Sequence, residues 1–160
     1  LLSNDKLYMH MFANRSYRKS NRTKKVHLKI SELAYGISAE ILQSSEVDHR
    51  QRLSTELLDE LCDLARIDIV NVEISSAKQH HRRSKGRVSM RQYGYYKPDV
   101  RYIYITNHTA VRGQPLAAKT FLNTLLHEWM HHYDTHKLKI NSMHTKGFYL
   151  RLGQLEKNLR

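Results

Sequence analysis

The stretch that decides the fold is residues 115–138, which read PLAAKTFLNTLLHEWMHHYDTHKL. Its apolar residues recur at the spacing of one face of an α-helix. These residues are Ala118, Phe121, Leu122, Leu125, Leu126, Trp129 and Tyr133. Gly113 breaks the chain just before this stretch, and Pro115 suits a first helical turn, where its missing N–H costs nothing. The spacing therefore predicts one long helix over residues 115–138.

The predicted helix contains an H-E-x-x-H motif, which runs from His127 through Glu128 to His131. Residues four apart lie on the same side of a helix, so the two histidines can bind one metal ion while Glu128 reaches a water molecule beside it. Both histidines lie off the apolar stripe. The alternative is an amphipathic helix that carries histidines on its polar face. The pattern favours a zinc hydrolase with one Zn²⁺ per chain.

A catalytic zinc site usually has three protein ligands and leaves a fourth position for water, so a third ligand is needed. His144 is the favoured candidate, because residues 141–142 suit a loop with a helix cap and a second helix is expected after them. The apolar residues that predict this second helix are Phe148, Leu152, Leu155 and Leu159. Glu156 on the same helix is the alternative ligand, and Asp134 and His136 rank below both.

The residues upstream of the long helix predict two further helices and three strands. The helices are expected over residues 31–43 and 53–66, the second with leucines on one face. The strands are expected over residues 69–74, 87–93 and 100–106, with a turn at residues 95–99. The expected fold is α+β, with a small three-stranded antiparallel sheet packed on the long helix and additional N-terminal and C-terminal helices.

The net charge of +12, from 27 basic and 15 acidic residues, is concentrated in two stretches that contain no acid. They lie between Asp5 and Glu32 and between Glu73 and Asp99. The side chains expected to bind nucleic acid are Arg18, Lys19, Arg22, Lys24, Lys25, Arg82, Arg83, Lys85, Arg87 and Arg91. Such surfaces are typical of proteins that bind polyanions, so the expected partner is DNA, single-stranded or mixed. The alternative is a solvated surface.

The two basic stretches differ in their expected form. Residues 1–25 read as a polar, loosely held N-terminal arm, in front of one compact domain over residues 26–160. The second stretch reads as a loop between two strands. It is followed by Tyr93, Tyr95 and Tyr96, whose rings could stack on unpaired bases; the alternative is that they belong to the core of the sheet.

Composition indicates the cellular compartment in which the protein is expected. The single cysteine, Cys62, lies on an apolar helix stripe and is expected in the core, which excludes an intrachain disulfide. No apolar run approaches membrane-spanning length, and the start of the chain lacks a signal-peptide pattern. We therefore expect an intracellular protein of the cytoplasm, nucleoid or nucleus, with no membrane partner.

The chain resembles the SprT-like zinc metallopeptidases, which include the Spartan type of DNA-dependent protease. The resemblance rests on the H-E-x-x-H motif, on His144 with Phe148 four residues later, and on the strand-like run at residues 102–105. It covers residues 53–159. The family usually has Gly directly after its third histidine, where this chain has Thr145.

The resemblance implies a zincin-like fold over residues 26–160 and a zinc endopeptidase that acts on proteins bound or crosslinked to DNA, in DNA repair. In such an enzyme zinc lowers the pKa of a water molecule, and Glu128 accepts its proton as the general base. Two other functions are compatible with the residues: a zinc protease that cleaves a free regulatory protein, and a non-catalytic DNA-binding module with a structural or vestigial zinc site. A purely structural site has no need of Glu128, so its presence favours catalysis.

Overall fold

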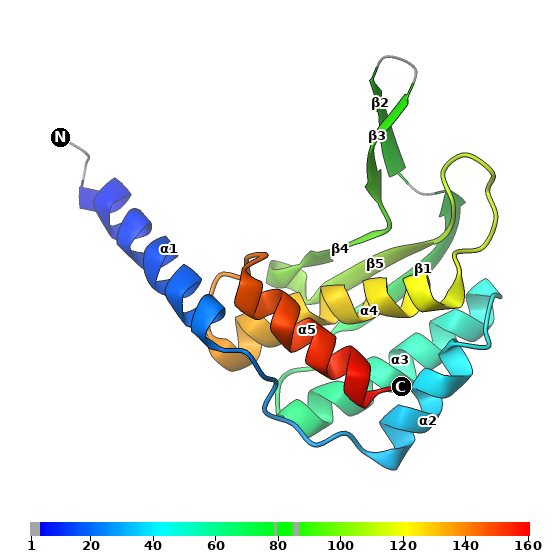
Figure 1. Cartoon of the computed structure of the whole chain (residues 1–160), viewed down its shortest axis with the longest axis horizontal. Helices are drawn as coiled ribbons and strands as arrows, with labels where there is room; N and C mark the ends of the chain where they lie inside the picture. The colour runs from blue at the N-terminus through cyan, green and yellow to red at the C-terminus, as the bar shows by residue number, and fades with distance from the viewer. Residues whose placement is uncertain (1–3, 79, 85–86) are drawn as a thin grey trace.

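The computed structural model describes residues 4–78, 80–84 and 87–160, but not the side chains of Asn4 and of residues 79–92 (Figure 1). The fold is α+β, as predicted. The helices are α1 (Asn4–Arg22), α2 (Glu32–Ile41), α3 (Val47–Ala65), α4 (Ala118–Tyr133) and α5 (Lys146–Asn158), with short 3-10 and π turns at Pro98–Val100 and Asp134–Leu138. The strands are β1 (Asn71–Lys78), β2 (His80–Ser84), β3 (Arg87–Gln92), β4 (Gly94–Lys97) and β5 (Tyr102–His108).

The central sheet has the order β1-β5-β4 and is mixed, so the prediction of an all-antiparallel sheet is wrong. Strand β1 runs parallel to β5, with Val72 opposite Ile103, whereas β4 runs antiparallel to β5, with Tyr96 opposite Ile103. The predicted strand at residues 87–93 is not in this sheet. Residues 87–92 form β3, which in the described part of the chain pairs with β2, in a hairpin that projects from the body (Figure 1).

The third strand of the sheet lies where the sequence predicts a turn. Residues 94–97 form β4, and the turn begins only at Pro98, whose 3-10 helix ends at Arg101 with a positive φ of 48°. Tyr95 and Tyr96 have the aromatic side chains that strands favour, which outweighs the turn signal of Pro98. Because residues 87–92 are not in the central sheet, β1 has β5 as its neighbour. The connection between β1 and β5 is long enough for the two strands to run parallel, which makes the sheet mixed.

Helix α4 is central to the packing. It contacts β4 and β5 on the sheet side, and it also contacts α2, α3 and α5. The core between these elements contains Leu57 and Leu61 of α3 and Trp129 of α4, which are fully buried. The predicted core position of Cys62 is confirmed, since it is fully buried and accepts a hydrogen bond from the Trp129 indole at 3.4 Å.

The observed ends of α4 differ from the predicted range of residues 115–138. Residues 115–117 stay extended, because Pro115 forms a bridge with His108 and the Leu116 N–H donates to the Asn107 carbonyl at 2.7 Å. At the other end the helix continues into the π turn Asp134–Leu138, which ends at Lys139 with a positive φ of 57°. The helix therefore spans most of the predicted range.

Within the predicted N-terminal arm over residues 1–25, the structure places helix α1 at Asn4–Arg22. Its N-terminal half projects from the body, and its C-terminal end lies beside α5 (Figure 1). Ser16 and Ser20 are buried in that contact, although the rest of the helix surface is exposed. In the described part of the chain, no helix combines the length and the apolar character that a bilayer crossing requires.

Candidate metal centre

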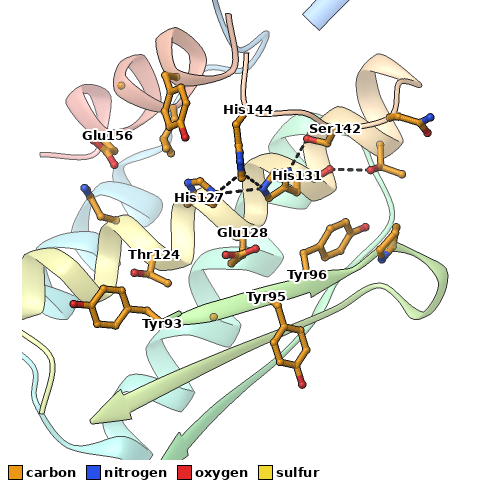
Figure 2. Close-up of a pocket in the computed structure, with 18 of the residues that line it drawn as sticks. Tyr93, Tyr95, Tyr96, Thr124, His127, Glu128, His131, Ser142, His144 and Glu156 are labelled. Atoms are coloured by element: carbon orange, nitrogen blue, oxygen red, sulfur yellow. Dashed lines mark hydrogen bonds between the residues drawn. The ribbon is translucent and has the colours of Figure 1, made fainter. Parts of the chain in front are cut away.

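Three imidazole rings meet at one side of α4, and their Nε2 atoms form a small triangle (Figure 2). The Nε2 atom of His144 lies 3.0 Å from that of His127 and 3.0 Å from that of His131, and the two α4 histidines are 3.3 Å apart. His127 and His131 are partly buried and His144 is exposed. The three residues predicted as ligands are therefore brought together.

The triangle has the dimensions of a zinc site. Zn–N bonds of 2.0–2.1 Å in tetrahedral geometry place two ligand nitrogens about 3.3 Å apart, close to the separations seen here. Within the described residues this histidine group could hold a metal ion. Glu156 lies elsewhere in the cleft, on α5, and is not part of the group.

The tautomer of His131 follows from its contacts. Its Nδ1 atom lies 2.7 Å from the Ser142 hydroxyl, and Ser142 donates its only hydrogen to Asp134 Oδ2 at 3.0 Å. The hydroxyl must therefore accept a hydrogen bond from His131 Nδ1–H, which leaves His131 Nε2 with a free lone pair. His131 therefore offers no Nε2–H to the triangle, and His127 and His144 can offer at most one each. At most two of the three Nε2–Nε2 contacts can then be hydrogen bonds. A bound cation would instead accept a lone pair from all three nitrogens.

Burial keeps the α4 histidines neutral. Burial, together with a smaller effect of the neighbouring imidazoles, lowers the pKa of His127 to about 4 and that of His131 to about 3. Neutral imidazole is the form that binds metal, so both rings are ready as ligands at pH 7.

The third histidine is positioned by the start of α5. His144 directly precedes Thr145, whose side chain caps the helix by accepting from the Phe148 N–H at 3.0 Å. The predicted cap at residues 141–142 is thus three residues too early. Phe148 is fully buried and packs against all three rings, with centroid distances of 4.7 Å to His131, 5.1 Å to His127 and 5.3 Å to His144.

Glu128 lies next to the imidazoles, on the side of the cleft that faces β4 (Figure 2). Its side chain is buried, and burial raises its pKa to about 7. Among the side chains that the structure describes, it has no ion-pair partner. A carboxylate with this pKa can both accept and release a proton near neutral pH.

The cleft around these residues has a volume of about 1110 Å³. It lies between α4, β4, the loop over residues 140–144 and α5. Gly94 of β4 allows the close approach of β4 and β5, because a Cβ there would lie 2.6 Å from the Tyr104 carbonyl oxygen. The strand β4 is at the edge of the described sheet, so one side of its backbone faces the cleft.

His132 has a structural role that its place in the sequence does not reveal. It is fully buried, its Nε2–H donates to the Asp68 carbonyl at 2.7 Å, and its Nδ1 accepts from the Tyr96 hydroxyl at 2.8 Å. Burial lowers its pKa to about 4. Sequence position suggests an exposed or ligand-supporting histidine, whereas the ring holds Tyr96 of β4 against α4.

Tyrosines could donate to a developing negative charge in this cleft. Tyr133 is excluded because it is fully buried and its hydroxyl accepts from the His27 N–H at 3.0 Å. Tyr149 lines the cleft, with its ring 5.9 Å from that of His144. No spacing pattern identifies Tyr149 in the sequence, because it reaches the cleft only through the docking of α5 on α4.

The three tyrosines considered for base stacking also line the cleft. One face of Tyr95 is already covered, since its ring stacks on Tyr104 with a centroid distance of 5.1 Å. Tyr96 is held by His132. All three rings are half-buried, and base stacking by them stays a prediction.

The predicted nucleic-acid residues lie in two places: at and just after the C-terminal half of α1, and on the projecting β2–β3 hairpin. Arg18, Lys19 and Arg22 lie on α1 and Lys24 and Lys25 follow it; all five are exposed, although Lys19 also donates to the Leu138 carbonyl. Arg82 and Arg83 lie on β2, and Arg87 and Arg91 on β3, with side chains that the structure does not describe. Lys85 lies outside the described residues. DNA contact by these residues stays a prediction.

Comparison of the chain with protein-family models, with curated proteins and with solved structures gives no match. The function therefore has to be inferred from the residues and their geometry.

Proposed function

We propose that this protein is a zinc-dependent endopeptidase with a zincin-like site that acts on proteins bound or crosslinked to DNA. The observation that supports it best is the triangle of Nε2 atoms, 3.0–3.3 Å apart, beside the buried carboxylate of Glu128. His127, His131 and His144 would hold the ion. Three histidines with an adjacent unliganded acid suit a catalytic zinc site better than a structural one.

The residues of the cleft divide the chemistry between them. When bound, zinc would act as a Lewis acid on the scissile carbonyl and would make a water molecule more acidic. Glu128 accepts a proton from the attacking water and then donates it to the leaving amine. Without metal, burial raises its pKa to about 7, and the positive charge of bound zinc would lower that value, so the carboxylate form would be present at neutral pH to accept the proton. We assign the Tyr149 hydroxyl, which lines the cleft, as the donor of a hydrogen bond to the developing oxyanion.

The edge strand β4 supports a polypeptide as substrate. Among the described strands, Gly94 to Lys97 pair with β5 on one side, and their other side faces the cleft. An extended peptide can add to such an edge through main-chain hydrogen bonds, which recognise a backbone and not a particular side chain. Binding of this kind suits a protease with many protein substrates.

The charge distribution supports DNA as the second partner. The N-terminal half of helix α1 and the β2–β3 hairpin project from the body (Figure 1), and α1 and the hairpin each include part of one acid-free stretch of the sequence. Contacts from these regions to phosphates would be independent of base sequence. A protease so equipped would be concentrated on proteins attached to DNA.

The first experiment measures bound zinc per chain and cleavage of an unfolded protein, with and without single-stranded DNA. We expect one zinc in the wild-type protein, weaker zinc binding in His144→Ala, and cleavage that DNA stimulates. Glu128→Gln should keep its zinc but cleave about 100-fold to 10,000-fold more slowly, because it removes the general base. Glu156→Gln is the matched control in the same cleft and should keep its zinc.

Other outcomes would favour the alternatives. DNA binding without zinc would indicate a non-catalytic DNA-binding module with a vestigial site. Zinc-dependent cleavage that DNA does not change would indicate a protease for a free protein. Cleavage that survives in Glu128→Gln would contradict the proposed role of Glu128.

The DNA contact is tested by salt dependence in the full chain. One double variant combines Arg18→Gln with Arg22→Gln on α1, and a second combines Arg82→Gln with Arg83→Gln on the hairpin. Removing one phosphate contact should reduce the slope of log affinity against log salt for a single-stranded oligonucleotide by about 0.7. An unchanged slope in both double variants would exclude these side chains from the interface.

A further inference from the structure

A buried hydrogen-bond network connects helix α1 with a ligand of the metal centre. We propose that Arg151 is a positioning residue that couples the docking of α1 to zinc binding, through Asp134, Ser142 and His131. This inference rests on the proposed zinc site. Arg151 lies on α5, and neither it nor Asp134 touches the triangle itself.

The network begins at the ligand. His131 donates from Nδ1 to the Ser142 hydroxyl at 2.7 Å, and Ser142 donates to Asp134 Oδ2 at 3.0 Å. The same Oδ2 atom accepts from the Arg151 guanidinium at 2.8 Å, in an ion pair whose two side chains are both 0% exposed. Hydrogen bonds of this kind fix the tautomer and the orientation of a metal-binding imidazole.

Arg151 completes the connection to α1. Its guanidinium donates to the Ser20 carbonyl at 2.7 Å, to the Thr23 carbonyl, and to the Ser20 hydroxyl at 3.2 Å. The last carbonyls of a helix have no partner within the helix and lie at the negative end of its dipole, so they suit a cation. If α1 moved away, a permanently charged group would lose these acceptors while still buried beside Asp134.

The same end of α1 also holds the loop that contains Ser142 and His144. The Ser20 hydroxyl lies 2.8 Å from the Thr145 hydroxyl, directly after His144. The Asn141 N–H donates to the Ser16 hydroxyl at 3.2 Å, directly before Ser142. Docking of α1 therefore restrains both sides of the short segment that supplies one ligand and the hydrogen-bond partner of another.

Gly147 makes this docking sterically possible. A Cβ at this position would lie 2.0 Å from the Ser20 carbonyl oxygen and 2.9 Å from backbone atoms of Asn21, closer than real contacts allow. The substitution Gly147→Ala would therefore displace α1 without changing any ligand. A Cβ on Gly153 of the same helix would meet no atom within 4 Å, so Gly153→Ala is a matched control.

The test measures zinc affinity of the full chain by competition with a chelating dye at pH 7.5, with circular dichroism to show that each variant is folded. We expect Gly147→Ala and Ser142→Ala to bind zinc about 10-fold to 100-fold more weakly, the usual effect of removing support from a metal ligand. Gly153→Ala should bind zinc like the wild-type protein. A folded Gly147→Ala protein with wild-type zinc affinity would overturn the coupling.

A second measurement covers the case in which Gly147→Ala does not fold. Coupling is reciprocal, so zinc must strengthen the docking of α1 if docking strengthens zinc binding. Zinc should slow hydrogen–deuterium exchange in residues 16–23 of the wild-type protein, and much less in Ser142→Ala. Equal zinc protection in both proteins would overturn the proposal.

The two proposals fail in different ways. If the wild-type protein binds no zinc, the proposed function fails and the coupling falls with it. Suppose instead that the wild-type protein binds zinc and cleaves with the help of Glu128. If Gly147→Ala then leaves the zinc affinity unchanged, and zinc does not slow hydrogen–deuterium exchange in residues 16–23, only the coupling fails.

Discussion

The floor of the cleft contains the buried carboxylate of Glu128, and the junction between α1 and α5 contains that of Asp134. The two carboxylates differ in the partners that surround them. Burial raises the pKa of both Glu128 and Asp134. Asp134 is 0% exposed and accepts from Arg151 and Ser142, whereas Glu128 is 8% exposed and, among the described side chains, has no ion-pair partner. Removing one partner of a buried ion pair leaves an uncompensated buried charge, whereas a buried acid without such a partner is available for proton transfer.

The same chemical change, from carboxylate to amide, should therefore have opposite effects in the two regions. Asp134→Asn leaves the buried charge of Arg151 without its counter-ion and should lower the free energy of unfolding by about 3–5 kcal/mol. Urea denaturation of the metal-free protein at pH 7 measures this change. Glu56→Gln is the control, because its pair with Arg52 is exposed and contributes little. An Asp134→Asn protein as stable as the control would remove the distinction between the two regions.

Glu128→Gln should stabilise the metal-free protein at pH 8. The folded-state pKa of about 7 is above the ordinary value of 4.5, so the folded state binds the proton more tightly than the unfolded state. Ionisation of Glu128 then lowers the free energy of unfolding as the pH rises from about 4.5 to about 7, by up to about 3 kcal/mol. The amide avoids this loss, so the two proteins should differ at pH 8 and agree at pH 4. Destabilisation at pH 8 would show that the Glu128 carboxylate has a stabilising partner after all.

The pH dependence of cleavage gives the smallest expected effect. In the proposed mechanism cleavage needs the ionised form of Glu128, so the rate should fall about tenfold for each pH unit below the pKa of this residue. That pKa is about 7 without metal, and the positive charge of zinc should move the midpoint of the profile to lower pH. The initial rate of cleavage between pH 5 and pH 9 measures the profile. A rate that is flat across this range would argue against a titrating general base.

The candidate site was the most predictable part of the molecule. His127, Glu128 and His131 lie within one helix, where local geometry alone places two side chains four residues apart on one side. His144 was predictable because the apolar spacing after it indicates a second helix, which had to pack on the first. The hydrogen-bond partners of the site were not predictable. Ser142 and Arg151 reach His131 and Asp134 only after α5 and α1 have docked.

The prediction placed the wrong strand in the central sheet, because the choice of pairing partner also depends on distant residues. Residues 87–93 and 94–97 both have strand character, and only their pairing partners separate them. Strand β3 pairs with β2, which is close in sequence, whereas β4 pairs with β5 and packs on α4. The side-chain pattern of a short strand does not specify its neighbour, so register and order depend on the whole fold.

The sequence by itself determined the α+β class, the central helix and the convergence of three histidines with a neighbouring acid. These features follow from periodicities that act over a few residues. Only the tertiary structure decided that residues 4–22 form a helix that contacts the candidate metal centre, and that Asp134 is paired with Arg151 while Glu128 faces the cleft. Contacts such as those of Ser20 with Arg151 join residues 131 positions apart, and no local pattern specifies which distant surfaces will meet.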